Sequence, residues 1–592
     1  MIDNWPQLQA DKFFETIRIV NFAVNSQGQL VFTTNIKGEY DLWGMDIPTN
    51  YPYPLTFNGQ MILFPTFSPD GSIIAFSSDL EGDESYQIYM IKGEGSEPIR
   101  ITEDGTRNEV NYITEDGKVY YTSNQDNPRY LTIFYYDLAE EEHYQLFPTE
   151  ELITVERVFE EEGYLHYTNF YSHTNIESWL YNLETDEQIL LALGEERHRS
   201  GEVVFINESQ LVFVTDYGED DSYLMKYDLA AKEFSTFLKE DGQINDLVIS
   251  PDKRWLTYLV SKGVEDYLYL YNLETDGNRQ IQTEATVIKQ IEPGKIDSYL
   301  YFLGSSATMP ENIYRYEMPT DKIEKLTDNR IPLISQDKLV EPETIRYSSF
   351  DGLEIEGLIY RAKSQNNGHW IVYPHGGPQS AERKFYRGLL QYLLANGYNI
   401  FAPNFRGSTC YGSQFMKMVE QDWGDGPRRD IISGVNWLVK EGYADSDKLF
   451  VMGGSYGGYL SLLLHGRHPE LWKGVVDQCG MTDLISYIES VPEHWKSIMK
   501  ERLGDIEEDR DKLIKDSPIT YIEEMRQPTL IIQGANDPRV PRTESDQMVE
   551  RFNELGYQVE YKVFADEGHI CRKKNNRIEE AELILNFLNS NL

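Results

Sequence analysis

A glycine-rich turn carries the first side chain that could do chemistry. The segment Gly453-Gly454-Ser455-Tyr456-Gly457-Gly458 follows an apolar run at residues 449–452 and precedes a helical stretch. In this strand, tight turn and helix setting, Gly-x-Ser-x-Gly holds a nucleophilic serine, because glycine tolerates the strained backbone that exposes the hydroxyl. We therefore predict that Ser455 attacks carbonyl carbons. An incidental serine in a glycine-rich turn is the simpler alternative, and the agreement between pattern and context disfavours it.

A serine hydroxyl is a weak nucleophile, so a base and an orienting carboxylate must accompany it. With this pattern the chain order is serine, then acid, then histidine. Four histidines follow Ser455: His465, His468, His494 and His569. The first two lie on or just past the helix after the serine, where we expect an exposed or helix-end role. His569 lies in a turn after the run at residues 559–564, and we predict that it is the base.

The predicted acid is Asp537. It follows the apolar run at residues 529–533, at the carboxyl end of an expected buried strand. A carboxylate there would hold the imidazole in the useful tautomer and stabilise the imidazolium. Asp546 comes later, within an expected helix, and is more simply a solvated carboxylate. With His569 as the base, activity is expected to fall below roughly pH 6 as the ring protonates.

Two backbone N–H groups are predicted to bind the developing oxyanion. The run at residues 371–373 ends in Pro374-His375-Gly376-Gly377-Pro378. Such a His-Gly-Gly pattern supplies one donor in serine hydrolases, and the residue after the nucleophile supplies the other. We therefore predict Gly377 and Tyr456 as donors, each lowering the barrier by roughly 3 kcal/mol. His375 precedes the nucleophile, so we interpret it as packing this loop and not as a second base.

The elements that must position these residues alternate between strand and helix from about Leu339 onward. Strands are predicted from apolar runs at residues 371–373, 398–401, 449–452 and 529–532. Helices are predicted at residues 385–395, 430–441 and 456–466. This alternation indicates a mostly parallel, doubly wound sheet with helices on both faces. We assign residues 335–592 to an α/β hydrolase domain, whose functional residues lie at the carboxyl ends of the strands.

The first half of the chain is a repeat array. One apolar-aromatic strand pattern recurs at intervals of 44 to 46 residues, at Phe32, Phe76, Tyr121, Tyr167, Phe213, Tyr258 and Phe302. A period near 45 made of short strands fits a four-stranded blade. We therefore predict an all-β, seven-bladed β-propeller at residues 21–331. Residues 1–20 form a separate N-terminal segment that we expect to pack on the hydrolase domain or on a neighbouring subunit.

Composition and charge exclude several classes of function. The chain has 98 acidic and 54 basic side chains, a net charge of −44, so nucleic acids and anionic membrane surfaces are poor partners. No stretch approaches the roughly 20 apolar residues of a membrane-spanning helix, and the N-terminus lacks a leader, so we expect a cytoplasmic protein. Cys410, Cys479 and Cys571 lack metal-ligand spacing, and we expect reduced thiols, no metal and no cofactor.

Together, these features resemble the prolyl oligopeptidase family of serine peptidases, and within it the acylaminoacyl peptidase branch. The resemblance covers nearly the whole chain and includes Asn404-Phe405-Arg406-Gly407-Ser408 beside the motifs described above. It implies cleavage of short peptides through an acyl-enzyme, with release of an N-acylated amino acid from a blocked N-terminus. It also implies a propeller that restricts access to the active site, and a homo-oligomer, either a dimer or larger.

The resemblance further implies substrate-binding residues. Arg539 looks like an arginine near the active site of relatives, where it would bind a substrate carbonyl or carboxylate; a structural ion pair is the alternative. The pocket for the side chain at the cleaved bond would be lined by residues that could equally belong to the core: Met481, Tyr487, Trp495 and Val540. The dipeptidyl-peptidase branch usually has a tyrosine in place of His375 and a paired-glutamate motif in the propeller, which has no convincing match here.

Other functions stay open at this point. A carboxylesterase, or a dipeptidyl peptidase or oligopeptidase of the same family, would use the same serine. A propeller that binds a protein partner beside a vestigial hydrolase would be a different class of protein. The presence of Ser455, Asp537 and His569 argues against that last alternative.

Overall fold

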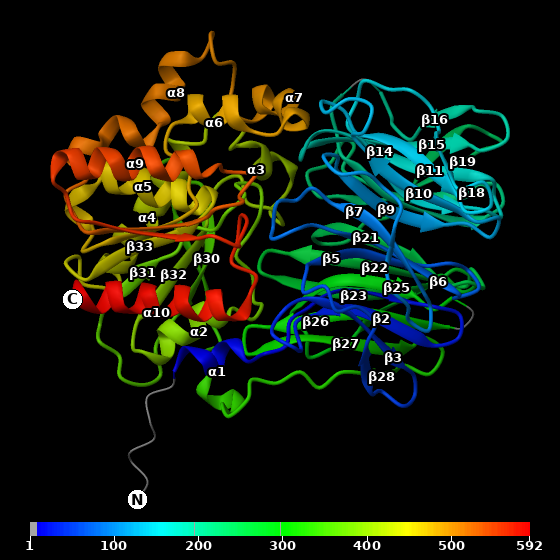
Figure 1. Cartoon of the computed structure of the whole chain (residues 1–592), viewed down its shortest axis with the longest axis horizontal. Helices are drawn as coiled ribbons and strands as arrows, with labels where there is room; N and C mark the ends of the chain where they lie inside the picture. The colour runs from blue at the N-terminus through cyan, green and yellow to red at the C-terminus, as the bar shows by residue number, and fades with distance from the viewer. Residues whose placement is uncertain (1–8, 195, 296–297) are drawn as a thin grey trace, which may run out of the picture.

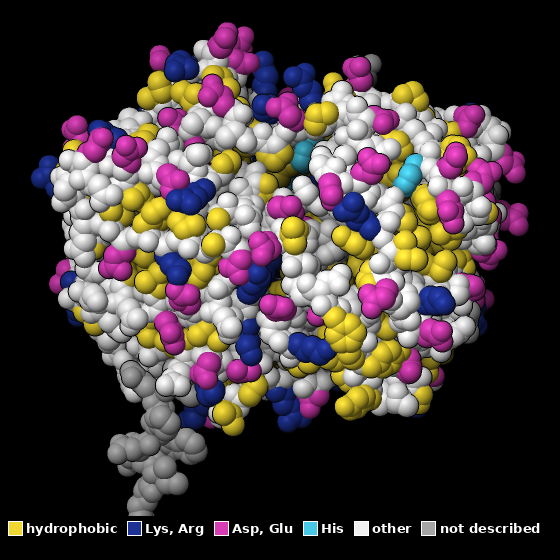
Figure 2. Space-filling view, viewed as in Figure 1, with side chains coloured by type: hydrophobic (Ala, Val, Ile, Leu, Met, Phe, Trp, Pro, Cys, Tyr) yellow, Lys and Arg dark blue, Asp and Glu magenta, His cyan; other side chains and the backbone are white. Residues whose placement is uncertain are grey.

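The computed structural model describes residues 9–194, 196–295 and 298–592. An all-β domain and an α/β domain lie side by side (Figure 1). The first helix, α1 (Ala10–Phe14), packs against helices of the α/β domain before the chain enters the all-β domain. Residues 1–8 of the N-terminal segment lie outside the described residues. Acidic side chains are scattered over the visible face of both domains (Figure 2).

The all-β domain is a ring of seven four-stranded antiparallel sheets, which confirms the predicted seven-bladed propeller. Each sheet uses four consecutive strands. The first three sheets contain β1 (Ile19–Val24), β2 (Gln29–Thr34), β3 (Asp41–Asp46), β4 (Pro52–Pro54), β5 (Ile62–Phe67), β6 (Ile73–Ser78), β7 (Gln87–Lys92), β8 (Ile99–Arg100), β9 (Asn108–Ile113), β10 (Lys118–Ser123), β11 (Thr132–Asp137) and β12 (Glu142–Gln145). The next two contain β13 (Ile153–Phe159), β14 (Tyr164–Ser172), β15 (Asn175–Asn182), β16 (Gln188–Leu190), β17 (Ser200–Asn207), β18 (Gln210–Thr215), β19 (Tyr223–Asp228) and β20 (Glu233–Leu238). The last two contain β21 (Gln243–Ile249), β22 (Trp255–Lys262), β23 (Glu265–Asn272), β24 (Gly277–Ile281), β25 (Val287–Pro293), β26 (Tyr299–Ser306), β27 (Met309–Glu317) and β28 (Lys322–Lys325).

The seven aromatic residues that reveal the repeat have one structural role. Each lies on the second strand of its sheet, and all seven side chains are buried. The first strands of neighbouring sheets contact each other, for example β1 with β5 and β17 with β21, so they lie nearest the axis of the ring. The repeat therefore marks the strand that fills the core between adjacent sheets.

The first and last sheets of the ring meet without sharing a strand. Side chains join them instead. Ile19 and Phe22 of β1 lie in one apolar cluster with Leu303 of β26. The Gln290 side-chain amide accepts a hydrogen bond from the Phe22 N–H at 3.1 Å and donates one to the Phe22 carbonyl at 2.8 Å. Gln290 thus replaces, at one residue, the backbone pairing that holds strands together within a sheet.

The α/β domain contains an eight-stranded sheet in the order β29-β30-β32-β31-β33-β34-β35-β36. The first three strands pair antiparallel, and all neighbours from β32 to β36 are parallel, as a mostly parallel sheet requires. The strands are β29 (Glu343–Ser348), β30 (Glu354–Tyr360), β31 (Trp370–Val372), β32 (Asn399–Asn404), β33 (Leu449–Gly454), β34 (Val475–Gln478), β35 (Thr529–Gly534) and β36 (Val559–Phe564). The helices are η1 (Gln336–Lys338), α2 (Gly388–Ala395), α3 (Ser413–Lys417), α4 (Gly426–Lys440), α5 (Tyr456–Arg467), η2 (Pro469–Leu471), α6 (Leu484–Ser490), α7 (Glu493–Arg502), α8 (Arg510–Asp516), η3 (Pro518–Glu524), α9 (Arg542–Leu555) and α10 (Lys574–Ser590).

Helices cover both faces of this sheet and bury two separate cores (Figure 1). The first core lies under α4 and α5 and includes Val435 and Leu460. The second core lies under α1, α2 and α10 and includes Phe13, Leu390 and Ile584. We call the two sides of the sheet the α5 face and the α10 face. Within the described residues, every helix is too short or too polar to cross a bilayer.

Candidate active site

Ser455 lies in a strained turn between β33 and α5. Its backbone has φ 55° and ψ −123°, and its N–H donates to the Gln478 carbonyl of the neighbouring strand at 2.8 Å. The flanking glycines are sterically required, because a Cβ on Gly453 would lie 2.4 Å from the Gly457 carbonyl oxygen. A Cβ on Gly457 would lie 2.1 Å from the Pro374 carbonyl oxygen. The turn therefore has the geometry of a nucleophile elbow, with strain concentrated at the serine.

Asp537 and His569 are hydrogen-bonded to each other. The His569 Nδ1 atom lies 2.8 Å from Asp537 Oδ2, and the two residues follow β35 and β36. Backbone N–H groups of Arg539 and Val540 donate to Asp537 Oδ1 at 2.9 and 3.0 Å, and the Gln533 amide donates to Oδ2 at 3.2 Å. The side chain of Asp537 is fully buried. A carboxylate held by four donors is rigid enough to orient an imidazole.

Ser455 and His569 line the same cavity, which has a volume of about 410 Å³. This volume falls within the range of roughly 300–1,000 Å³ that is typical of small-molecule sites. Among the described contacts, the Ser455 hydroxyl makes no hydrogen bond to His569. Catalytic hydrogen bonds are often long in the free enzyme and tighten when substrate binds.

Cys479 follows β34 and lies against the same histidine. Its thiol donates to the His569 carbonyl oxygen at 3.1 Å. Burial lowers the pKa of His569, whereas Cys479 and Asp537 raise it, and the pKa lies above its ordinary value of 6.5. Cys479 can raise it only as a thiolate, and burial also raises the pKa of this thiol. Near neutral pH, Asp537 is therefore the neighbour that favours the imidazolium.

The raised pKa of His569 predicts how kcat/KM depends on pH. A general base must be neutral, so activity is lost as the pH falls through the pKa of His569. We expect the acidic limb of kcat/KM above pH 6.5, higher than the sequence alone indicated. Cys479→Ala is expected to leave this limb in place, because the thiol is neutral in this range. A pH profile of both proteins checks this, and a limb at or below pH 6 would contradict it.

The loop after β31 passes directly beside Ser455. A Cβ on Gly376 would lie 3.4 Å from the Cβ of Ser455, and Gly377 has φ +134°. Among the described residues, the N–H groups of Gly377 and Tyr456 donate to no protein acceptor. His375 stacks on Phe405 with ring centroids 4.2 Å apart, and its Nε2 lies 2.9 Å from the Ser408 hydroxyl. The histidine therefore packs the loop, and burial lowers its pKa to about 4.

The predicted substrate-binding residues fall into two groups. Arg539 lines the cavity, and its Nε donates to the Glu84 carboxylate of the propeller at 2.7 Å, so the ion pair anticipated as an alternative is present. Met481, Tyr487 and Val540 are buried in the core of the α5 face, and Trp495 packs against that core half-buried. None of these four lines the cavity.

Two other histidines, His465 and His468, contact protein groups at the end of α5. His465 lies in the last turn of α5, as the expected helix-end role requires, but it is fully buried, which corrects the alternative of an exposed role; burial lowers its pKa to about 3. Its ring accepts a hydrogen bond from the Gln527 N–H at 3.2 Å, because α5 packs tightly against the segment that precedes β35. At the end of α5, the Nε2 atom of His468 lies 2.6 Å from the Nη1 atom of Arg428.

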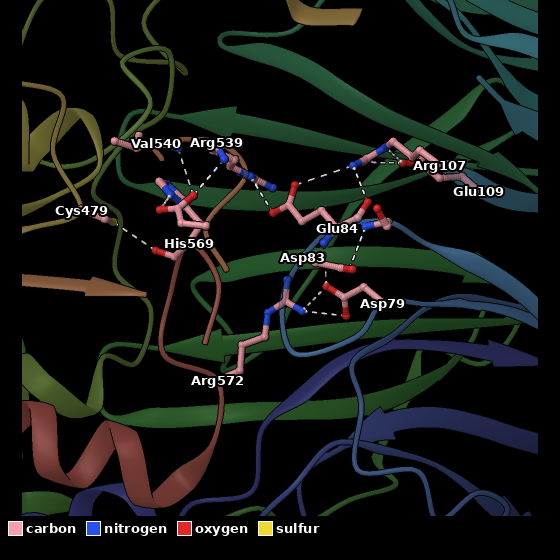
Figure 3. Close-up of polar contacts among 12 residues, drawn as sticks. Asp79, Asp83, Glu84, Arg107, Glu109, Cys479, Arg539, Val540, His569 and Arg572 are labelled. Carbon is pink, nitrogen blue, oxygen red and sulfur yellow. Dashed lines mark hydrogen bonds and ion pairs between the residues drawn. The ribbon is translucent and has the colours of Figure 1, made fainter. Parts of the chain in front are cut away.

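A propeller loop clamps both segments that carry Asp537 and His569. This loop, residues 79–84 after β6, is called here the blade-2 loop (Figure 3). Asp79 accepts two hydrogen bonds from Arg572 at 2.7 and 2.9 Å, and Glu84 pairs with Arg539 at 2.7 Å. Arg539 follows Asp537 by two residues, and Arg572 follows His569 by three. The propeller therefore helps to position Asp537 and His569.

The backbone contact in this clamp gives a second prediction. A Cβ on Gly82 would lie 2.6 Å from the Gly568 nitrogen, directly before His569. Gly82→Ala is expected to displace the histidine and lower kcat/KM about 10²-fold, as a misplacement near 1 Å can do. Gly105 has a similar φ, +84°, but open space around it, so Gly105→Ala is the control for backbone strain alone. Equal activity of the two variants in a peptide anilide assay would refute the clamp.

The sequence analysis did not assign Cys479 to this site. Cys479 follows a strand of only four residues, too short to stand out, although its place at the carboxyl edge of the sheet was available as a signal.

Ligand-type atoms of Cys479, Asp537 and His569 lie within 4.8 Å of one another, so these three residues are the group in the site that could hold a metal ion. Two of them, Asp537 and His569, are already hydrogen-bonded to each other.

Each of the two domains matches a known family model. A family model described as the N-terminal β-propeller domain of prolyl oligopeptidase matches residues 63–329. A second, described as the prolyl oligopeptidase family, matches residues 384–592. Dipeptidyl aminopeptidase BIII of Pseudoxanthomonas mexicana is 34% identical over 288 residues, which are 46% of this chain and 42% of that protein. An acylamino-acid-releasing enzyme of Arabidopsis thaliana is 30% identical over 225 residues, 36% of this chain and 29% of that protein. The matched segments thus span less than half the length of these relatives.

Solved structures resemble the whole chain at low identity. A puromycin-hydrolyzing peptidase of Mycobacterium tuberculosis aligns with a TM-score of 0.87 at 17% identity, covering 100% of this chain and 97% of that one. The acylaminoacyl peptidase of Pyrococcus horikoshii aligns with a TM-score of 0.74 at 18% identity, covering 99% and 98%. At these identities the likeness establishes the two-domain fold.

Proposed function

The chain belongs to the prolyl oligopeptidase family and is a serine hydrolase of that family, and we propose that it releases N-acylated amino acids from the blocked N-termini of short peptides. The observation that carries the proposal is the Asp537–His569 hydrogen bond beside the strained Ser455. Family membership argues against a vestigial hydrolase attached to a binding propeller.

The proposed reaction assigns one role to each group. His569 accepts the Ser455 proton as the hydroxyl oxygen attacks the carbonyl carbon, and Asp537 stabilises the imidazolium. The N–H groups of Gly377 and Tyr456 bind the oxyanion of the tetrahedral intermediate. His569 then protonates the leaving amine, and the acyl group remains on Ser455. Water, deprotonated by His569, hydrolyses this ester and restores the serine.

Charge pairing in the blade-2 loop supports a blocked N-terminus. A free α-ammonium group needs an unpaired carboxylate near the site. Glu84, the propeller carboxylate that reaches Arg539, pairs with that residue at 2.7 Å and also lies 3.7 Å from Arg107. Its charge is therefore already satisfied by two arginines. An uncharged acyl group avoids the cost of breaking these pairs.

The acyl-side pocket is proposed to be small. Met481, Tyr487, Trp495 and Val540 form its wall in this proposal, and three of them are already buried against their neighbours. A small side chain such as alanine at the cleaved bond fits such a wall with the least rearrangement. Larger side chains would require the core of the α5 face to repack.

A substrate panel tests the proposal. N-acetyl-alanyl p-nitroanilide is expected to be cleaved faster than alanyl-alanyl p-nitroanilide, which has a free N-terminus. Preference for the free dipeptide would support the second candidate, a dipeptidyl aminopeptidase, which the 34% identity to dipeptidyl aminopeptidase BIII favours. Cleavage of a p-nitrophenyl ester with neither anilide cleaved would identify a carboxylesterase instead.

A further inference from the structure

The cavity beside Ser455 extends well beyond the proposed catalytic residues. Besides Ser455 and His569, its lining includes the loop after β31, Arg387, Arg577 of α10, and Arg18, which precedes β1. The proposed reaction uses only the mouth of this space. The proposed chemistry gives no occupant for the rest of this cavity, whose whole volume is about 410 Å³.

The lining of the cavity is cationic in an acidic protein. Four arginines line it, namely Arg18, Arg387, Arg539 and Arg577, against two acids, Glu311 and Glu580. The whole chain carries a net charge of −44, and acidic side chains are scattered over its visible surface (Figure 2). A local excess of arginine inside such a protein indicates a binding site for an anion.

Three of the four arginines already have acidic partners. Arg539 pairs with Glu84, and Arg387 pairs with Glu382 at 2.8 Å. Arg18 lies 3.9 Å from Glu311, which also pairs with Lys289.

Arg577 differs from the other three. Its Nη1 atom is buried and has no hydrogen-bond partner among the described residues. The guanidinium lies over the Phe14 ring, 4.8 Å from the ring centroid. Burial and the nearby Arg18 lower the pKa of Arg577, and they outweigh Tyr40, Glu580 and Glu311, which raise it.

The nearby acid Glu580 neutralises Arg577 only in part. It accepts a hydrogen bond from the Gln478 side chain at 2.6 Å, and burial raises its pKa to about 7. A carboxyl group that is about half protonated near neutral pH cannot fully neutralise an arginine. A bound carboxylate would do so with two parallel hydrogen bonds.

The position of the cavity indicates which half of a peptide it receives. The proposed acyl-side wall belongs to the core of the α5 face. The apolar residues that line the cavity, including Phe14, Tyr373, Leu390 and Ile532, belong to the core of the α10 face. Ser455 lies at the edge of the sheet between these faces. A peptide with its acyl half on the α5 face extends its leaving half into the cavity.

We propose that this cavity is a leaving-group subsite in which Arg577, assisted by Arg18, binds the free C-terminal carboxylate of a short substrate. The substrate class is therefore blocked peptides that end within a few residues of the cleaved bond. This inference rests on the proposed function, since it requires peptide cleavage at Ser455.

Paired substrates test the subsite. N-acetyl-Ala-Ala-Ala with a free C-terminus is compared with its C-terminal amide, in the wild-type protein and in Arg577→Gln. We expect kcat/KM for the acid to exceed that for the amide at least tenfold, and the preference to disappear in the variant. N-acetyl-alanyl p-nitroanilide has no terminal carboxylate, so its turnover is expected to change less than twofold. Arg551→Gln, which removes an exposed arginine paired with Glu554, is the matched control for net charge.

The outcomes separate the subsite from the proposed function. Equal rates for acid and amide in the wild type, or an acid preference that survives in Arg577→Gln, would overturn the subsite while anilide cleavage still supports the peptidase. Loss of the preference in Arg551→Gln would show that only overall charge matters, which also overturns it. Failure to cleave the anilide at all would refute the proposed function instead.

Discussion

Ser455→Ala is expected to lower kcat on N-acetyl-alanyl p-nitroanilide by about 10⁵-fold or more, because removal of the nucleophile from a serine triad costs on that order. The fold should survive, since the Ser455 side chain makes no hydrogen bond among the described contacts and alanine keeps the Cβ. Esterase activity should fall with amidase activity, because both reactions pass through the same acyl-enzyme.

The control for this variant is a serine of similar chemistry outside the cavity. Ser433 on α4 is partly exposed and its hydroxyl donates to the Arg429 carbonyl. Ser433→Ala is expected to keep full activity. Equal thermal unfolding of both variants and the wild type would show that the loss is chemical. Residual amide cleavage above 1% in a pure Ser455→Ala preparation would reject the proposed nucleophile.

Asp537→Asn is expected to lower kcat by about 10⁴-fold, because the amide favours the wrong tautomer of His569 without changing the shape of the site. Asn can still accept hydrogen bonds from the Arg539 and Val540 N–H groups at Oδ1, so the loop geometry should be kept. The loss should also be accompanied by a lower pKa of His569, since the carboxylate that raises it is removed.

Asp546 is the matched control for this charge change. It is the alternative carboxylate considered in the sequence analysis. Its side chain accepts hydrogen bonds from Tyr561 on β36 and from Arg542 on α9. Asp546→Asn is expected to keep activity within a few fold. If the Asp546 variant lost more activity than the Asp537 variant, the assignment of the acid would be wrong.

The fold was largely predictable because its signals are local and periodic. The repeat spacing depends on one buried aromatic residue in each sheet, and a slip of one residue would turn that side chain to the other side of the sheet. The sequence around Ser455 is equally constrained, since backbone atoms lie where any side chain at Gly453 or Gly457 would have to be. Asp537 and His569 were found because the carboxyl ends of parallel strands gather at one edge.

Features that depend on two distant segments were not predictable. The pairs Asp79–Arg572 and Glu84–Arg539 join residues that are 493 and 455 positions apart, and no pattern links them. The same holds for Arg18 and Arg577 of the cavity, which come from opposite ends of the chain. Met481 and Val540 could not be assigned from sequence because an apolar residue at a strand end suits a pocket wall and a core equally.

The way in which the ring closes has a mechanical consequence. Within each sheet, separating two strands breaks a whole ladder of backbone bonds. Separating the first and last sheets breaks the two contacts of Gln290, the hydrogen bond from Asn329 to the Ile17 carbonyl, the Arg18–Glu311 ion pair and an apolar patch. Other neighbouring sheets are also linked by the chain itself, so we expect the bore of the ring to widen first at this joint while the blades stay intact. That joint adjoins Arg18, so loosening it would also enlarge the inner end of the cavity.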